Sequence, residues 1–159
     1  MAESTGWNQQ KLSSAIAQGK IYPLYFLYGE EIFLANETIA ELQRLIVAEG
    51  MKDFNFHSFY GQDVKAVDVR DAIETLPMMA AHRLVVLREA QQFSDKDWEV
   101  LLPLLKDPIS STVFVCCSEK VDKRKRYFKG FQDRGVVVEF KRPFDYQIPD
   151  WIARFAQRQ

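Results

Sequence analysis

The sequence predicts an α/β fold with a five-stranded, mainly parallel sheet that is flanked by helices. Apolar segments of strand length alternate along the chain with segments whose apolar residues recur at steps of three and four. This alternation is typical of a parallel sheet covered on both faces, and right-handed crossovers are then expected. With 159 residues, of which 47% are hydrophobic, the chain is long enough for one domain with a sizeable core.

The first strand and the first helix of this pattern are expected on either side of Gly29. Residues 22–28 form an apolar and aromatic run that ends at this glycine. A helix is expected over residues 30–48, where the apolar side chains recur at helical spacing. We expect Glu30 and Glu31 in its first turn, because the helix dipole favours negative charge there.

Two further strands are expected around the second helix. Residues 54–60 alternate in the manner of a strand, and residues 64–75 show helical spacing. Pro77 cannot continue that helix, and it biases the preceding residue away from the helical region. The apolar run at residues 83–88 follows almost at once and is expected to be the central strand.

The second half of the chain continues the alternation. Ser94 and Asp97 have the spacing of a helix start. Pro103 is expected to kink or split the helix that follows. The remaining elements are expected to be a strand, a basic helix and a fifth strand, over residues 111–117, 123–134 and 136–140.

The last stretch of the chain has the pattern of an additional element. Pro143 closes the fifth strand, and amphipathic helical spacing begins near Tyr146. We therefore expect an N-terminal domain over residues 1–143 and the truncated start of a second domain over residues 144–159. A terminal helix that packs back onto the sheet fits the same pattern equally well.

Composition limits the classes of function. The net charge of −1 implies no general polyanion-binding field, so a nucleic-acid role would need a local patch. Cys116 and Cys117 are neighbours in a predicted strand, where their side chains point to opposite faces and an ordinary disulfide between them is disfavoured. The absence of a cysteine framework, a signal peptide and a membrane span predicts a cytoplasmic protein.

The turn around Gly29 occupies the place of a phosphate loop in an α/β nucleotide-binding fold. A phosphate loop needs several glycines, a lysine and a Ser or Thr, so that backbone N–H groups can surround the phosphates. Here Gly29 is alone, and the carboxylates of Glu30 and Glu31 would repel a triphosphate. A plain strand-to-helix turn is the favoured interpretation, and a divergent P-loop NTPase is an alternative.

The end of the strand at residues 83–88 also lacks a catalytic acid. Arg88 stands where an ATPase of the P-loop type would place a metal-binding Asp, and an arginine would repel the metal. Glu89 is expected to be a solvated loop residue and no catalytic base. The segment therefore indicates a protein that binds a partner without chemistry of its own.

Four residues before this strand form a candidate binding tip. Leu76, Pro77, Met78 and Met79 follow the second predicted helix, and the proline places them on a turn, where core burial is hard to arrange. Methionine suits an adaptable contact surface, although a methionine pair is more often part of a core. The tip is a candidate site for binding a partner protein.

A basic segment at residues 120–129 is the second candidate site. It contains Lys120, Lys123, Arg124 and Arg126 among its six basic residues. Such a segment is usually a solvated helix face. Its functional interpretation is contact with phosphates or with an acidic partner, as in a nucleic-acid-binding module.

Catalytic and metal-binding motifs are not found in the sequence. His57 and His82 are far apart, and no Cys/His set has the spacing of a zinc site. The motif GxSxG of serine hydrolases is absent. We therefore expect no catalytic residues, no metal and no cofactor.

Four segments, in this order, resemble the delta-subunit family of bacterial DNA polymerase III, the wrench of the clamp loader: YPLYFLYGEE, ETLPMMAAHRLVVLREA, STVFVCCSEKVDKRKRYFK and VVVEFKRPFDYQIPDWIARFA. Each motif is loose, but their order and spacing are specific together and extend over nearly the whole chain. The resemblance implies an AAA+/P-loop-like domain with a degenerate nucleotide site. It also implies a non-catalytic subunit of a DNA polymerase holoenzyme.

The resemblance also implies a role for the tip. In this family the tip inserts an apolar pair into a hydrophobic pocket of the β sliding clamp and favours ring opening for loading on DNA during replication. The matching positions are Met78 and Met79, with Leu76 and Pro77 alongside. Other members commonly carry Leu or Phe in the pair, so two methionines are a departure that still suits an apolar pocket.

The partners that the resemblance implies are the β sliding clamp, the delta prime and tau/gamma subunits of the loader, and DNA within the assembly. No membrane is implied. Asp122, Lys123 and Arg124 match a Asp-Lys-Arg stretch of the family, for which the resemblance gives no role.

Overall fold

The computed structural model describes residues 6–141 and contains a five-stranded sheet with the strand order β2-β3-β4-β1-β5. All four pairs of neighbouring strands are parallel. This confirms the predicted α/β class and the parallel sheet. The strands are β1 (Leu24–Tyr28), β2 (Phe56–Tyr60), β3 (Arg83–Arg88), β4 (Thr112–Ser118) and β5 (Val136–Glu139).

The strand at residues 83–88 has the predicted bounds, but it is not the central strand. β4 holds the middle position, and β3 lies between β4 and the edge strand β2. Both β3 and β4 are continuous apolar runs with nearly every residue buried. Because both strands are continuous apolar runs, the sequence pattern could not show which of them is central.

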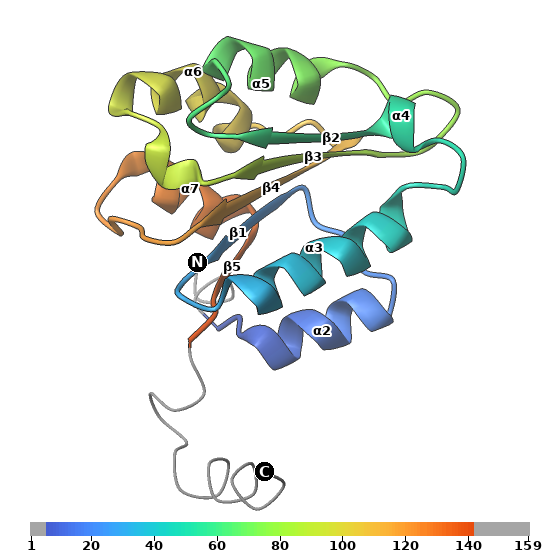
Figure 1. Ribbon diagram of the computed structural model, residues 1–159, viewed down its shortest axis with the longest axis horizontal. Coiled ribbons are helices and arrows are strands. Elements are labelled where there is room, and N and C mark those ends of the chain that lie inside the picture. Colours follow the sequence, from blue (N-terminus) through green and yellow to red (C-terminus); the bar gives the residue numbers. More distant parts are fainter. Residues whose placement is uncertain (1–5, 142–159) are drawn as a thin grey trace, which may run out of the picture.

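Helices cover both faces of the sheet (Figure 1). One face is covered by α2 and α3, and the other by α5, α6 and α7, as the two clusters of buried side chains show. The helical elements are α2 (Gln9–Ala17), α3 (Ile32–Ile46), α4 (Lys52–Asn55), α5 (Ala66–Glu74), the 3-10 turn η1 (Ala90–Gln92), α6 (Asp95–Lys106) and α7 (Arg126–Arg134). The sequence patterns had not indicated α2, α4 or η1.

Three helix predictions need correction. Glu30 and Glu31 precede α3, which begins at Ile32 and has no acidic residue in its first turn. The predicted basic helix begins only at Arg126, so most of its lysines lie before it. Pro103 does not split α6; it lies in the last third of the helix with its ring exposed, and the helix continues to Lys106.

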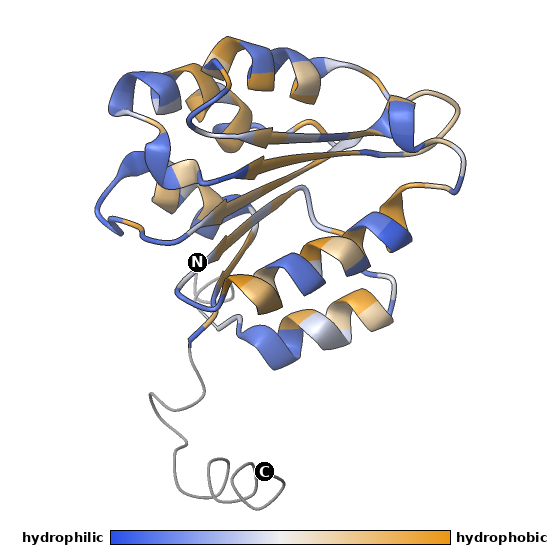
Figure 2. Cartoon of the chain, viewed as in Figure 1, coloured by the Kyte–Doolittle hydropathy of each residue, from blue (hydrophilic) through white to orange (hydrophobic). Residues whose placement is uncertain are grey.

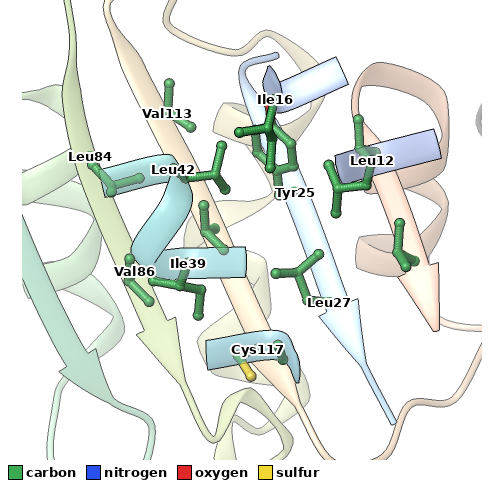
Figure 3. Packing of buried hydrophobic residues seen from close by; sticks show 14 of the residues in the cluster. Leu12, Ile16, Tyr25, Leu27, Ile39, Leu42, Leu84, Val86, Val113 and Cys117 are labelled. Atoms are coloured by element: carbon green, nitrogen blue, oxygen red, sulfur yellow. The ribbon is translucent and has the colours of Figure 1, made fainter. Parts of the chain in front are cut away.

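The core consists of two layers, one on each face of the sheet. Side chains from α2 and α3 meet alternate residues of β1, β3 and β4, among them Tyr25, Leu27 and Val86 (Figure 3). The strands are accordingly apolar along most of their length (Figure 2). Cys116 and Cys117 belong to opposite layers and are both free, as the strand geometry predicted.

The two candidate sites lie at opposite edges of the sheet. In a parallel sheet, strand-to-helix connections gather at the carboxyl edge and helix-to-strand connections at the amino edge. The Gly29 turn, Arg88 and the basic segment follow strands and belong to the carboxyl edge. Residues 75–82 connect α5 to β3 and belong to the amino edge. The predicted second domain at residues 144–159 lies outside the described residues.

Candidate partner-binding tip

The tip residues lie on an exposed connection, as the proline predicted. Leu76 is 74% exposed, Met78 49% and Met79 91%, and Pro77 is partly buried. Apolar side chains with this degree of exposure are the exception in this chain, whose β3 and β4 side chains are almost entirely buried. The structure therefore excludes a core role for Met79 and leaves the tip free to contact a partner.

The end of α5 is fixed by two threonine hydroxyls. Thr75 Oγ1 donates to the carbonyl oxygen of Asp71 at 2.7 Å. Thr75 thus caps the last turn of α5 with its own side chain. Thr112 Oγ1, which is buried in β4, donates to the carbonyl oxygen of Ile73 at 2.7 Å. These bonds satisfy carbonyl groups that a helix end leaves without partners. They tie the start of the tip to the sheet.

Asn55 holds the middle of the tip. Its Nδ2 donates to the carbonyl oxygen of Met78 at 2.8 Å, and the Met78 amide donates to its Oδ1 at 2.7 Å. The Asn55 side chain is fully buried at the end of α4. A buried amide with both ends hydrogen-bonded fixes the position of the backbone to which it bonds. The sequence offered only a weak signal for this role, a polar residue between Phe54 and Phe56.

Arg83 is a second support that the sequence patterns missed. It is 4% exposed at the start of β3, and its Nη1 donates to the carbonyl oxygen of Leu76 at 3.3 Å. Burial lowers the pKa of the Arg83 guanidinium. The pKa of nearby His57 is lowered as well, first by burial and then by the charge of Arg83. Asn55 and Arg83 thus both hydrogen-bond to the tip backbone from buried positions.

Met79 has an unusual backbone. Its φ of 53° lies in the left-handed region, which a side chain with a Cβ disfavours by about 1–3 kcal/mol. Such a conformation persists only where the surrounding structure fixes it. The hydrogen bonds at Met78 and Leu76 are the contacts that do so here. The hydrogen bonds of its neighbours therefore fix the backbone that bears Met79, the most exposed side chain of the tip.

The Gly29 turn at the carboxyl edge uses its N–H groups internally. The Gly29 amide donates to the Ser118 carbonyl at 3.0 Å, the Glu31 amide to the Phe140 carbonyl at 3.2 Å, and the Ile32 amide to the Glu30 carbonyl at 3.1 Å. A phosphate loop needs such groups to point at the ligand. The turn is thus built as a plain strand-to-helix connection.

Arg88 is held at the same edge by neutral side chains. Its Nη1 donates to Asn36 Oδ1 at 2.6 Å and its Nε to Ser58 Oγ at 3.1 Å. Glu89 follows with a φ of 54°. Neutral groups therefore hold the Arg88 guanidinium at the carboxyl end of β3, where the sequence pattern placed the metal-binding acid of an ATPase. Among residues 6–141, no group of His, Cys, Asp or Glu side chains could hold a metal ion.

Most of the basic segment precedes α7, which begins only at Arg126, so its charges do not lie on the single basic helix that was predicted. Arg124 is bonded to both carboxylate oxygens of Asp122 at 3.0 Å, and Lys125 Nζ lies 3.1 Å from Asp95. The hydrogen bonds from Arg124 lower the pKa of Asp122 to about 2. The ammonium of Lys123 lies 5.7 Å from the centre of the Tyr28 ring.

Arg126 belongs to a separate group of charged residues. It lines a groove between α6 and α7 together with Lys106, Lys129 and Arg134. Lys120 is exposed before α7, and its carbonyl oxygen accepts a hydrogen bond from Ser118 Oγ. The four predicted basic residues thus belong to different surroundings.

No helix in the described part of the chain is long and apolar enough to cross a membrane.

Known structures identify the class of the fold. RuvB from Thermotoga maritima matches with a TM-score of 0.51 and 20% identity, covering 83% of this chain and 43% of that one. A DNA polymerase III gamma-subunit-related protein from Thermotoga maritima matches with a TM-score of 0.60 and 12% identity, covering 95% of this chain and 49% of that one. The chain has an α/β fold of the AAA+ type without a recognisable phosphate loop.

The family follows from the sequence. The model of the family described as DNA polymerase III, delta subunit, matches residues 25–141, and the chain belongs to this family. The DNA polymerase III subunit delta of Bacillus subtilis is 27% identical over 156 residues, covering 91% of this chain and 45% of the relative.

A solved structure gives the same assignment. The DNA clamp loader delta protein of Bacillus subtilis matches with a TM-score of 0.77 and 26% identity, covering 84% of this chain and 42% of that one. The chain therefore spans less than half the length of these relatives.

Proposed function

We propose that this chain is the clamp-binding part of a clamp-loader delta subunit. In this proposal Leu76, Pro77, Met78 and Met79 enter an apolar pocket of the β sliding clamp. The observation that carries the proposal is an apolar tip with Met79 91% exposed on a backbone held by the buried side chains of Asn55 and Arg83. A fixed tip binds at lower entropic cost than a flexible loop.

The methionines would supply most of the binding free energy. Burial of a methionine side chain contributes about 1.5–3 kcal/mol, and thioether chains fill irregular apolar pockets well. Ring opening follows if the tip binds the open clamp more tightly than the closed clamp, because a ligand shifts an equilibrium only by its differential affinity. No covalent chemistry is needed for this function.

The absence of catalysis is part of the same proposal. The amides of Gly29, Glu31 and Ile32 are bonded to protein carbonyls, and Arg88 stands in place of the metal-binding acid. We expect the delta prime and tau/gamma subunits of the loader, and DNA in the assembly, as the further partners. The Bacillus subtilis relative described as a DNA clamp loader delta protein supports this context.

Nucleic-acid binding is a second candidate function. One observation favours it: Lys106, Arg126, Lys129 and Arg134 outnumber the single carboxylate, that of Asp133, in the lining of the groove between α6 and α7. Lys120, Lys123 and Arg124 remain candidate contacts for DNA or a partner. The test is to measure binding to a DNA duplex at several salt concentrations. This function is supported if the affinity falls steeply with salt and if Arg126→Gln/Lys129→Gln reduces it.

The test of the clamp-binding proposal is calorimetric titration of this chain with the cognate sliding clamp. Met78→Ser/Met79→Ser is expected to weaken binding by about 30-fold or more, which corresponds to about 2 kcal/mol. The matched control is Ile32→Ser/Phe33→Ser, which removes two adjacent exposed apolar side chains at the opposite edge of the sheet. Unchanged binding by a folded tip variant, or no binding by the parent chain, would contradict the proposal.

A further inference from the structure

We infer that Phe54 in α4 forms a second part of the clamp-binding surface, next to the tip. This inference rests on the function proposed above and adds a contact residue to it. Phe54 is 50% exposed, although its chain neighbour Asn55 is fully buried and Phe56 packs against the core. An aromatic side chain held half out of the core between two anchored residues is available to a partner.

The position of Phe54 relative to the tip is fixed by hydrogen bonds. Asn55 forms two of them with the backbone of Met78, which is 23 residues away in sequence. Phe54 is therefore covalently next to the residue that holds the tip. Figure 1 shows α4 beside the connection that leads into β3.

The short helix that carries Phe54 is also fixed. The amides of Phe54 and Asn55 donate to the Met51 carbonyl at 3.1 and 2.9 Å. Both parts of the surface thus belong to one ordered unit, which would lower the entropic cost of binding.

The exposed apolar side chains separate into two groups by their place in the topology. Phe54, the tip and Leu45, near the end of α3, belong to the amino edge of the sheet. The second group belongs to the carboxyl edge and consists of Ile32, Phe33, Tyr60 and Val67. Contiguous exposed apolar groups mark binding surfaces, whereas isolated ones need no explanation. Phe54 shares the amino edge with the tip, and its chain neighbour Asn55 is hydrogen-bonded to Met78.

The occupant that this surface fits is the same clamp that receives the tip. Because Phe54 and Met78 are joined through Asn55, a partner that covers the methionines also approaches the phenyl ring. Aromatic side chains are enriched in the cores of protein interfaces, where they provide a large apolar area with little loss of side-chain freedom. Phe54 is therefore expected to pack against an apolar surface beside the clamp pocket.

The experiment is calorimetric titration of the full chain with the cognate sliding clamp. Phe54→Ser is expected to weaken binding about fivefold or more, in line with the loss of a buried aromatic contact. Phe33→Ser is the matched control, because Phe33 is 66% exposed at the other edge, and it is expected to bind like the parent. Phe54→Leu should keep most of the affinity, since it restores an apolar group.

The outcomes separate this inference from the proposed function. If Met78→Ser/Met79→Ser loses binding while Phe54→Ser binds like Phe33→Ser, the inference is overturned and the tip stands. If Met78→Ser/Met79→Ser binds like the parent, the tip is not the clamp-binding site. Both the proposed function and this inference are then contradicted. Circular dichroism and Met78 amide exchange show whether Phe54→Ser keeps the fold and the Asn55 contact. If it does not, a folded Phe54→Gln takes its place: weaker binding than that of Phe54→Leu supports the inference, and binding like the parent overturns it.

Discussion

The side chain of Asn55 and the backbone of Met78 form a reciprocal pair of hydrogen bonds across two connections of the fold. The Asn55 carbonyl oxygen accepts from the Met78 amide, and the Asn55 amide group donates to the Met78 carbonyl. An asparagine side chain can do this because it carries a donor and an acceptor on one planar group. The pair links the connection before β2 to the connection before β3 at the amino edge of the sheet.

Replacing Asn55 with leucine is expected to loosen the tip. The substitution keeps the volume but removes both hydrogen bonds, and we expect the free energy of unfolding to fall by about 1–3 kcal/mol. Urea unfolding measures this loss. Hydrogen exchange at the Met78 amide should become faster, and clamp affinity should fall because the tip must be ordered on binding.

A second asparagine provides the control for that variant. Asn36→Leu removes the hydrogen bond to Arg88 at the opposite edge and should leave the exchange of the Met78 amide unchanged. Equal protection of the Met78 amide in the parent and in Asn55→Leu would show that the pair does not hold the tip.

The stability of the domain is expected to depend on the ionisation of His57. Its pKa is lowered from the ordinary 6.5, first by burial and then by the charge of Arg83. Below pH 6.5 the unfolded chain therefore binds more protons than the folded chain, so stability falls as the pH drops from 6.5 toward the folded pKa. Above pH 6.5 the His57 side chain is neutral in both states, so this loss of stability does not occur.

Urea unfolding of the parent and of His57→Gln between pH 7.5 and pH 5.5, a range of about two units around the histidine pKa, measures this effect. The parent should lose more stability than the variant across that interval. Parallel curves for the two proteins would mean that His57 protonates as easily in the folded chain as in the unfolded chain.

The fold class was predictable because apolar periodicity encodes it directly. Continuous apolar runs such as that of β4 and the spaced apolar positions of α3 require a sheet between helices. The order of the strands was less accessible, since β3 and β4 are both buried on both faces. The helix starts after Gly29 and Lys125 were placed too early, because charged residues that precede a helix resemble those in its first turn.

The exposed tip was predictable and its supports were not. Pro77 breaks helical periodicity, and this local effect placed the methionines on a turn. Asn55 and Arg83 act on the tip across the fold, through bonds that connect residues 23 and 7 positions apart. Polar side chains buried by tertiary structure leave no periodic signal in the sequence. The strand predicted over residues 54–60 forms from Phe56 onward, whereas Phe54 lies in the short helix α4, which the alternating pattern of this segment did not indicate.

Magnesium ATP is expected to leave the stability of this chain unchanged. A ligand that binds only the folded state raises the free energy of unfolding by about 2.7 kcal/mol at 100 times its dissociation constant. The Gly29 turn offers no such site, because its Gly29, Glu31 and Ile32 amides donate to protein carbonyls. Thermal unfolding with and without millimolar MgATP measures the effect, and the midpoint should not move.

An acid at position 88 provides the sharper form of this prediction. Arg88→Asp restores the acid of the metal-binding position and removes the cation that Asn36 and Ser58 hold. If the missing acid alone prevented nucleotide binding, this variant would gain a saturable response to MgATP. We expect no gain, because the turn still lacks the lysine, the hydroxyl and the outward-pointing amides that hold phosphates. A saturable shift in the midpoint of the parent chain would instead favour the divergent NTPase.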